Sequence, residues 1–478
     1  MQIALGPVVG HTTHNSTRIW VQSDSSAVGG LSLHCEIYVD SALSQAVPGS
    51  PFLFETRDAQ GYSGVADIVA LPNANQEYFY RITHLGVPLH QDVYRFRTLP
   101  VGNPQRFRFA VTSCHLPFKY SGANQTLMWR RMREVLDTQG VDMVMQIGDQ
   151  IYTDEPKPWF GKSNTYWDRA LAAQGRGDTA AVVEEFRNCH RKFWSAPEWR
   201  AVAANCPQYM IWDDHDIVNG WGSEDVHATL RHQAAFAAAR QVYHEYQHSH
   251  NPITQPNTFY YGFDIGAAAF MVLDLRGNRQ AWNNQLLGAS QVQWVDQFLT
   301  QRPHATVLFL ISSVPMFHLS PRWAALPKLL GLNVSDVTDQ WSSPPNRGDR
   351  IAILKRLYQW LDEVPGRRVV ILGGDVHLGT FGKAVYTGGQ SARQLIQATT
   401  SPISNKPADL LDRFVRRVSG RFSLNLENGL GLDVNLSHRF TQRNFLIVNM
   451  EFPAGSSVPS IVLEFHTENS AAPQYFAV

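Results

Sequence analysis

Cysteine is scarce in this chain of 478 residues, which contains four copies. No two of them have CxxC spacing, so a disulfide framework is not expected. A surplus of charge of one sign is also lacking, because 41 basic residues balance 41 acidic ones. Without net positive charge or a run of lysine and arginine, specific or non-specific nucleic-acid binding is not expected.

Long hydrophobic runs are absent as well. No stretch reaches the roughly 18 consecutive apolar residues of a membrane-spanning helix. The first residues, MQIALGP, lack the basic segment, the apolar segment and the twin arginine of export signals. We therefore expect a cytoplasmic protein from the sequence as it stands, and a periplasmic or secreted one if the chain is a mature form. Nothing in the sequence sets an oligomeric state.

Residues 1–100 have the pattern of a small all-β domain. Short alternating segments at 17–22, 33–39, 65–71, 78–82 and 94–98 are separated by turn-forming residues. This spacing predicts a β-sandwich of the immunoglobulin or fibronectin kind. Trp20 is expected to be its core aromatic residue. The proline- and glycine-containing stretch 99–104 is a plausible linker.

From residue 105 to 478 strands and helices alternate, which predicts an α/β domain. Met128, Met132, Val135 and Leu136 share one helix face, and the helix should end at Gly140. A helical insertion is expected at about 156–206. The segment 315–348 reads as a long loop, and such loops are usually functional or mobile. The stretches 445–451 and 461–465 predict a terminal antiparallel strand pair.

Metal-ligand side chains follow several predicted strands. A buried strand at 141–147 ends at Gly148, and Asp149, Tyr152 and Asp154 come directly after it. One Gly-Asp pair most often marks an ordinary turn, but this pattern recurs. The other strand ends carry Cys114 and His115, then Asp213, Asp214, His215 and Asp216, and finally Asp375 and His377. Strand ends meet at one edge of a sheet, so these side chains are expected to form one site.

The combination of carboxylates, an imidazole, a phenol and a thiol suits a two-metal centre. Two cations about 3.5–4 Å apart need a bridging carboxylate and further oxygen and nitrogen ligands. Asp149 is our choice for the bridge. Such a centre favours in-line displacement at phosphorus, with one metal activating a water. His215, next to a ligand, could protonate the leaving alkoxide.

Each of these residues also has a plainer interpretation. Cys114 could be a small buried hydrophobic residue, and Tyr152 a packed aromatic. Asp213 is expected to be structural. Arg276 is a candidate catalytic residue that binds phosphate, although a network of Arg276 and Arg279 with Asp274 is slightly favoured. Six histidines have no partner pattern and stay unassigned: His190, His227, His232, His244, His248 and His250.

Four ordered motifs carry a resemblance to a known family. They are Gly148-Asp149 with Tyr152 and Asp154, residues 212–216 with Asn219, Leu273-Asp274 with Arg276, and Gly374-Asp375 with His377. Together with Ser113-Cys114, this set resembles the alkaline phosphatase D-like (PhoD-like) family of the calcineurin-like metallophosphoesterases. In that family a cysteine replaces the first aspartate of the wider superfamily. The resemblance covers nearly the whole chain, including the N-terminal β-sandwich.

The resemblance implies a four-layer α/β/β/α sandwich with metals at the strand ends, and hydrolysis of phosphate monoesters and diesters. Iron with calcium are the implied metals, with zinc or manganese as alternatives. By motif position Cys114, Asp149, Tyr152 and Asp375 would hold the iron. Asp149, Asp214 and His377 would hold the second metal, and His215 would be the leaving-group acid. The chain departs from the pattern at His115 and in the segment 315–348.

Three functions are therefore weighed. The leading one is a metallophosphoesterase that acts on an anionic phosphate ester. A phospholipase-D-like or nucleotide phosphodiesterase activity at the same site is the alternative within enzymes. A non-catalytic protein that binds a partner through the β-sandwich is the third, and intact ligands at all four motifs argue against it.

Overall fold

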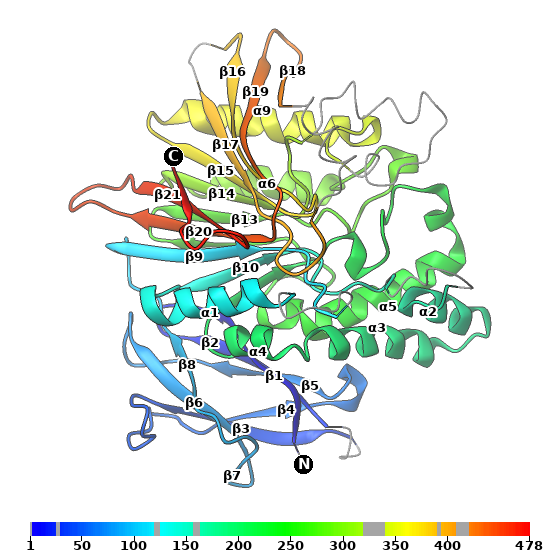
Figure 1. The fold of residues 1–478 in the computed structure, drawn as a ribbon, viewed down its shortest axis with the longest axis vertical. Helices are drawn as coiled ribbons and strands as arrows, with labels where there is room; N and C mark the ends of the chain where they lie inside the picture. Colours follow the sequence, from blue (N-terminus) through cyan, green and yellow to red (C-terminus); the bar gives the residue numbers. More distant parts are fainter. Residues whose placement is uncertain are drawn as a thin grey trace.

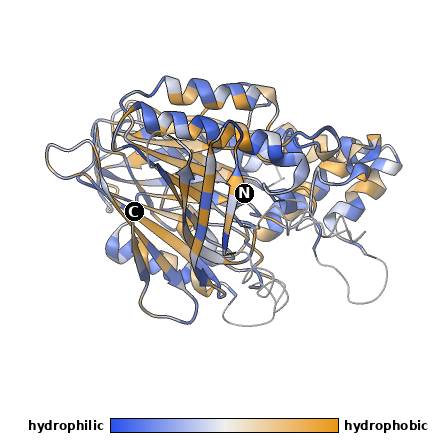
Figure 2. Ribbon diagram, turned by 90° about the horizontal axis from the view of Figure 1, so that it is seen from above, coloured by the Kyte–Doolittle hydropathy of each residue, from blue (hydrophilic) through white to orange (hydrophobic). Residues whose placement is uncertain are grey.

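The computed structural model describes residues 2–24, 29–118, 125–155, 163–318, 340–389, 393–407 and 420–478. Two β-sheets at the N-terminal end lie below two larger sheets that carry the rest of the fold (Figure 1). Hydrophobic residues concentrate on the central strands, whereas the outer helices carry both polar and apolar residues (Figure 2). Among the helices of the described ranges, none has the length and apolar composition that a bilayer span requires.

The N-terminal part is all-β, as the alternation predicts. One sheet has the order β1 (Ile3–Thr12), β2 (Thr17–Ser23), β5 (Ser63–Ile68). The other has the order β4 (Phe52–Thr56), β3 (Leu31–Tyr38), β6 (Glu77–His84), β7 (Val87–Pro88), and β8 (Tyr94–Arg97) also pairs with β6. Strands β1, β4 and β7 lie outside the segments that the alternation predicts.

Trp20 does not lie in the core of this β-sandwich, so that prediction is wrong. Its neighbours Ile19 and Val21 are the ones that face the core between the two sheets. Successive side chains of a strand point to opposite faces, so Trp20 faces away. It packs against Trp194 and Tyr246 with ring centroids 5.4 and 5.3 Å away. Trp20 therefore joins the N-terminal sheets to the helices of the larger part.

The first large sheet combines parallel and antiparallel strands. Strands β9 (Arg106–Thr112), β10 (Met143–Ile147) and β11 (Gln208–Ile211) are parallel neighbours. On the other side of β9 follow β20 (Asn444–Glu451), β21 (Ser460–Thr467) and β22 (Gln474–Ala477), all antiparallel. The predicted terminal strand pair is confirmed as β20 and β21, and it extends the sheet that begins the motif region.

The second large sheet has eight strands. In order they are β12 (Tyr261–Ile265), β13 (Ala268–Val272), β14 (Val307–Ser312), β15 (Arg368–Gly373), β17 (Gln394–Thr399), β16 (Gly379–Thr387), β19 (Gly431–Phe440) and β18 (Arg421–Asn425). Strands β13, β14, β15 and β17 are parallel. The two large sheets pack face to face, because the ring of Phe109 lies 5.2 Å from that of Phe270 and 5.1 Å from that of Phe309.

Helices cover the outer faces of both large sheets (Figure 1). Helix α1 (Leu127–Gln139) and α4 (Pro197–Ala203) lie under the six-stranded sheet. The predicted apolar face of α1 is confirmed as buried. Helices α6 (Ala289–Thr300) and α9 (Arg347–Glu363) share a core with the eight-stranded sheet. Helix α9 begins before the predicted Asp349.

A helical group extends to one side of the sheets (Figure 1). It contains α2 (Tyr166–Gly175), α3 (Thr179–Phe193) and α5 (Leu230–Tyr246). Helices α2, α3 and α4 lie within 156–206, where the helical insertion is predicted, and the first part of that segment, 156–162, lies outside the described residues. Most of the predicted loop 315–348 lies outside them as well, apart from 315–318 and 340–348.

Candidate metal centre

The motif side chains come together at the carboxyl ends of parallel strands from both large sheets. Cys114 follows β9, Asp149 follows β10 and Asp214 follows β11. Asp375 and His377 follow β15 of the facing sheet. Loops that leave the same edge of neighbouring parallel strands converge, which is why separate motifs can form one site.

Four of these residues have a strained backbone. Cys114, Asp149, Asp375 and His377 have φ angles of 60°, 56°, 63° and 50°. This left-handed region costs about 1–3 kcal/mol for a residue with a side chain, and such residues concentrate at functional sites. The rest of the fold therefore holds these four side chains in positions that an unstrained chain would not choose.

Two glycines permit the close approach of the loops. A Cβ atom on Gly148, whose φ is 115°, would lie 2.6 Å from Cβ of Asp213. A Cβ atom on Gly374 would lie 2.8 Å from Cβ of Ser113. Any side chain at either position would push the motif loops apart.

The described residues contain three groups of potential ligand atoms that lie mutually within 4.8 Å. The first is Cys114, Asp149 and His377, and the second is Asp149, Asp214 and His215. Asp149 belongs to both, which is the position expected of a bridging carboxylate. The third group is Asp213, Asp214 and Asp375.

The grouping differs in detail from the one that the resemblance implies. His377 belongs to a group with Cys114 and Asp149, and Asp375 belongs to a group with Asp213 and Asp214. The backbone turns tightly between these two residues, because the N–H groups of Val376 and His377 donate to the carbonyls of Gly374 and Asp375.

Cys114 and Tyr152 lie among polar atoms. Sγ of Cys114 is 3.4 Å from Oδ2 of Asp149 and 3.0 Å from Oγ of Ser401. The Tyr152 hydroxyl donates to the same Asp149 oxygen over 3.0 Å. Tyr152 also packs on the His215 ring at 4.3 Å between centroids. A cysteine that served only as a small apolar residue would not need these neighbours.

The ionisation of the site also fits a cation. Burial raises the pKa of Asp149 well above its usual range, and neighbouring carboxylates add to this rise although His215 opposes it. Burial likewise raises the pKa of Cys114 and of Tyr152. Oδ1 of Asp149 is buried and accepts no hydrogen bond from the described residues. A bound cation would favour the ionised forms and use this oxygen.

Comparison with known proteins agrees with this geometry. A family model described as "PhoD-like phosphatase" matches residues 109–409, which is more than half of the chain. The chain belongs to the PhoD-like phosphatase family. The resemblance drawn from the motifs is thereby confirmed.

Two relatives illustrate the extent of the match. Alkaline phosphatase D of Bacillus subtilis (strain 168) is 25% identical over 331 residues, 63% of this chain and 51% of that protein. The chain thus spans about half the length of the curated relative it matches. A solved structure titled "Structure of PhoD" has a TM-score of 0.69 and 17% identity, and covers 99% of this chain and 92% of the other. The PhoD-like fold therefore extends over the whole chain.

His215 has a carboxylate partner that the sequence did not single out. Nδ1 of His215 lies 2.7 Å from Oδ1 of the buried Asp154. Burial opposes the positive charge of His215, but Asp154, Asp214 and Asp149 outweigh it and raise its pKa well above 6.5. The sequence marks Asp154 as an oxygen donor and a motif residue after Asp149, without a link to His215.

Arg276 lies behind the candidate ligands. Its Nε donates to Oδ1 of Asp213, and its side chain is 0% exposed. A second nitrogen of the guanidinium lies 3.6 Å from Oδ1 of Asp214. The predicted contact with Asp274 is made by the Arg276 backbone N–H, over 3.0 Å. These contacts orient Asp213 and Asp214, and direct binding of phosphate by Arg276 stays a prediction.

The structural interpretation of Asp213 is confirmed. Its side chain caps the short helix Asp214–Asp216 and accepts from Arg276 and from Ser313 Oγ. His115, a departure from the family pattern, is also structural. Its Nδ1 accepts from Trp129 Nε1 over 3.0 Å, away from the ligand groups.

Three supporting residues had no assigned role in the sequence. Asp216 accepts hydrogen bonds from the backbone N–H groups of Asp149 and Asp213, over 2.9 and 2.8 Å. Gln340 donates to Oδ2 of Asp375 over 3.1 Å. Asn405 lies 3.3 Å from Nε2 of His377. Asp216 stands inside a recognised motif, whereas Gln340 and Asn405 lie in stretches without a ligand pattern.

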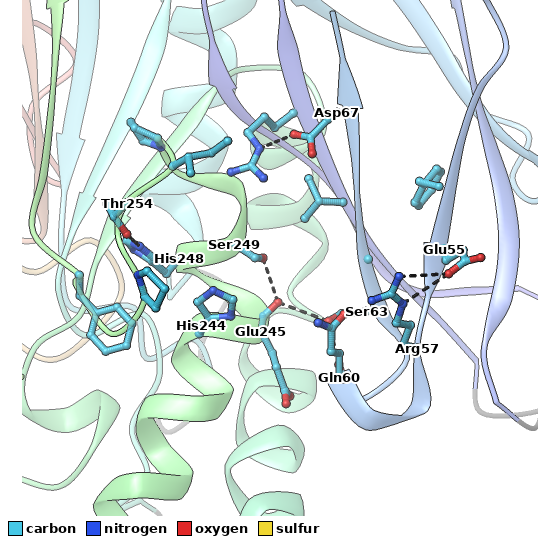
Figure 3. A pocket seen from close by; sticks show the side chains of 18 of the residues that line it. Glu55, Arg57, Gln60, Ser63, Asp67, His244, Glu245, His248, Ser249 and Thr254 are labelled. Atoms are coloured by element: carbon cyan, nitrogen blue, oxygen red, sulfur yellow. Dashed lines mark hydrogen bonds and ion pairs between the residues drawn. The ribbon is translucent and has the colours of Figure 1, made fainter.

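A cavity of about 790 Å³ lies elsewhere, between the N-terminal sheets and the loop 252–259. His244 and His248 lie side by side in it, with ring centroids 6.0 Å apart (Figure 3). Its lining includes none of the six predicted metal ligands. The strand-end site and this cavity are therefore separate.

Proposed function

We propose that this protein hydrolyses phosphate esters, either diesters, monoesters or both, at a two-metal centre. The observation that carries the proposal is the position of Asp149. Its carboxylate belongs to one ligand group with Cys114 and His377 and to another with Asp214 and His215. A carboxylate shared by two such groups is what a bridged pair of cations requires.

The residues that would hold the metals are Cys114, Asp149, Tyr152, Asp214, Asp375 and His377. Thiolate and phenolate ligands together favour iron over calcium on their side of Asp149, and the remaining oxygen ligands suit calcium. Zinc or manganese are the alternatives. Two cations held there would stabilise charge on the phosphate oxygens and lower the pKa of a water, as at other two-metal centres.

The side chains around the ligands have distinct tasks in this proposal. His215 donates a proton to the leaving oxygen, and Asp154 keeps its imidazole oriented and charged. Arg276 and Asp216 hold Asp213, Asp214 and Asp149 in position. The substrate is an anionic phosphate ester, because the donor set and its cations attract phosphate oxygens.

We further propose two domains, 1–100 and 105–478, with the facing sheets as the inner layers of a four-layer α/β/β/α sandwich. The packing of Phe109 against Phe270 and Phe309 supports the two inner layers. Trp20 and its contacts with Trp194 and Tyr246 support a fixed junction between the domains.

Metal analysis and turnover of two chromogenic esters test the proposal. Purified protein should contain metal and release p-nitrophenolate from p-nitrophenyl phosphate, from bis-p-nitrophenyl phosphate or from both. Asp149→Asn should lose both metals and turnover, because one carboxylate serves two cations. Asp264→Asn, which changes a surface carboxylate paired with Arg302, is the matched control and should keep both.

Two results would count against this assignment. Full metal content in Asp149→Asn would mean that Asp149 is not the bridge. Metal-replete wild-type protein that hydrolyses neither ester would favour a binding protein in which the N-terminal sheets contact a partner.

A further inference from the structure

A second cavity, of about 300 Å³, lies between the start of α9 and strand β18. Its walls are mainly apolar and include Trp341, Leu354, Leu424 and Leu426. Five polar residues interrupt these walls: Ser342, Arg347, Arg350, Ser423 and Asn425. Cavities of about 300 Å³ are at the lower end of small-molecule sites.

Arg350 is the unusual residue of this cavity. It is 4% exposed, and its guanidinium donates one hydrogen bond, to the Met316 carbonyl over 2.8 Å. Its Nε is buried and has no acceptor among the described residues. None of their carboxylates lies within ion-pair distance of it, and its guanidinium carbon lies 5.7 Å from the centroid of the Phe317 ring. Burial lowers its pKa to about 9, so it stays charged at neutral pH.

A buried charge without a partner is costly, so proteins almost always pair it. A guanidinium has five N–H donors, and most of those of Arg350 have no acceptor among the described residues. Such a group is therefore suited to receive an anion from outside the chain.

Two further hydrogen-bond donors that line the cavity also have no side-chain partner among the described residues. Oγ of Ser342 is buried and has no hydrogen-bond partner among the described residues. Arg347, the first residue of α9, is exposed, and no described residue forms an ion pair or a side-chain hydrogen bond with it. The N-terminal end of this 17-residue helix adds a favourable potential for negative charge.

We propose that this cavity binds a small organic anion, a carboxylate or phosphate attached to an apolar body. The anionic group would lie against Arg350, Arg347 and Ser342. The apolar body would pack on Trp341, Leu424 and Leu426. The site is separate from the metal centre, and the inference does not depend on the proposed hydrolysis.

The cavity is connected to the metal centre through one short segment. Trp341 follows Gln340, which donates to Oδ2 of Asp375. The Trp341 indole N–H also donates to Oγ of Ser312 over 3.0 Å, at the end of β14. An anion that packs on Trp341 therefore contacts the neighbour of Gln340, and the Gln340 side chain is hydrogen-bonded to the candidate ligand Asp375. The anion can be a fragment released by hydrolysis or an independent small molecule.

Calorimetric titration with 4-bromobenzoate tests the site, and 4-bromobenzyl alcohol is the neutral control. We expect saturable binding of the carboxylate and at least about tenfold weaker binding of the alcohol, since charge-assisted hydrogen bonds are the strong ones. Arg350→Met should weaken the carboxylate at least tenfold and leave the alcohol unchanged. Arg356→Met, on the same helix but paired with Asp296, is the matched control and should bind like wild type.

Arg350→Met should fold, because a flexible apolar residue replaces an unpaired buried charge. Its Tm should equal or exceed that of wild type, and a lower Tm would indicate a structural role. Arg347→Met changes an exposed side chain. It therefore tests the contribution of the second arginine to the affinity for 4-bromobenzoate without altering the protein core. The bromine of 4-bromobenzoate should give an anomalous peak in the cavity in a crystal of the complex.

Whether the site prefers a carboxylate or a phosphate is measured in the Asp149→Asn variant, because the proposed metal centre should not hydrolyse the phosphate ester there. There 4-bromophenyl phosphate and 4-bromobenzoate are compared directly, and the tighter ligand identifies the class. No saturable binding of either probe to wild type would overturn the proposal. Equal affinity of 4-bromobenzoate for wild type, Arg350→Met and Arg347→Met would overturn it as well.

Discussion

Asp154 and His215 form a carboxylate–imidazole pair beside the candidate metal ligands. Oδ1 of Asp154 lies 2.7 Å from Nδ1 of His215, and the Asp154 side chain is 6% exposed. In the proposed mechanism Nδ1 of His215 carries a proton toward Asp154, and Nε2 serves the substrate. This relation links the motif after β10 to the motif after β11.

His215→Ala should reduce the hydrolysis of alkyl phosphate esters by about 10²–10⁴-fold, the usual value of general acid catalysis. Esters of p-nitrophenol should lose much less, because that leaving group departs with little help. A leaving-group series on wild type and variant, with metals quantified in both, measures the contrast. Asp154→Asn should show the same trend with a smaller loss.

Two outcomes would exclude this role. An equal loss across the leaving-group series would remove the acid function of His215. A loss of metal in His215→Ala would make His215 a ligand, which its place in the group with Asp149 and Asp214 makes a concrete alternative.

Cys114→Ala should lose part of the bound metal and any visible colour. A thiolate or phenolate on ferric iron gives a charge-transfer band, and Cys114 is the thiol beside Asp149. Visible absorption and metal content of wild type and variant measure the effect. Cys35→Ala, a buried cysteine in the N-terminal core, is the control and should keep both.

Metal-replete protein without colour, together with full metal content in Cys114→Ala, would contradict the iron assignment. Zinc or manganese held by the remaining ligands would then be the better interpretation.

Arg276→Ala should destabilise the protein by about 3–5 kcal/mol, the cost of removing one partner from a buried ion pair. The variant leaves Asp213 buried without its main partner. Urea unfolding of wild type and variant measures the change. Arg57→Ala, from an exposed pair with Glu55, should change stability by about 1 kcal/mol or less. Unchanged stability with a raised KM would instead support direct phosphate binding by Arg276.

Stability should fall as the pH is lowered from 6.5 toward 4, partly because of His190. Burial lowers the pKa of His190 from 6.5 to about 4. Between these values the unfolded chain binds the proton and the folded chain does not, so acid favours unfolding. The neutral ring is needed, because Nδ1 donates to the Phe186 carbonyl and Nε2 accepts from Gln247.

The measurement is the free energy of unfolding at several pH values in this window. One proton corresponds to about 1.4 kcal/mol per pH unit. His190→Gln should have a shallower slope than wild type by up to that amount, and the exposed His14→Gln should have the wild-type slope. Identical slopes in all three proteins would show that His190 is protonated equally in the folded and unfolded states.

The sequence by itself determined the elements that depend on local pattern. The apolar face of α1, the all-β N-terminal part and the strand pair β20 and β21 follow from side-chain period. The convergence of the motifs also followed, because parallel strands direct their carboxyl ends to one edge. Cys114, Asp149 and Asp375 could be singled out for that reason, without a structure.

Only the tertiary structure decided toward which face of its sheet a side chain points and which distant residues it contacts. The side to which Trp20 points depends on what packs on either face of its sheet, since alternation alone does not say which face is the core. The contact of Gln340 with Asp375 joins two segments that no local pattern relates. The sequence likewise does not show that Arg350 is buried without a charged partner among the described residues, because an arginine on a helix is usually solvent-exposed. Burial and pairing depend on segments distant along the chain, and these three properties therefore required the folded structure.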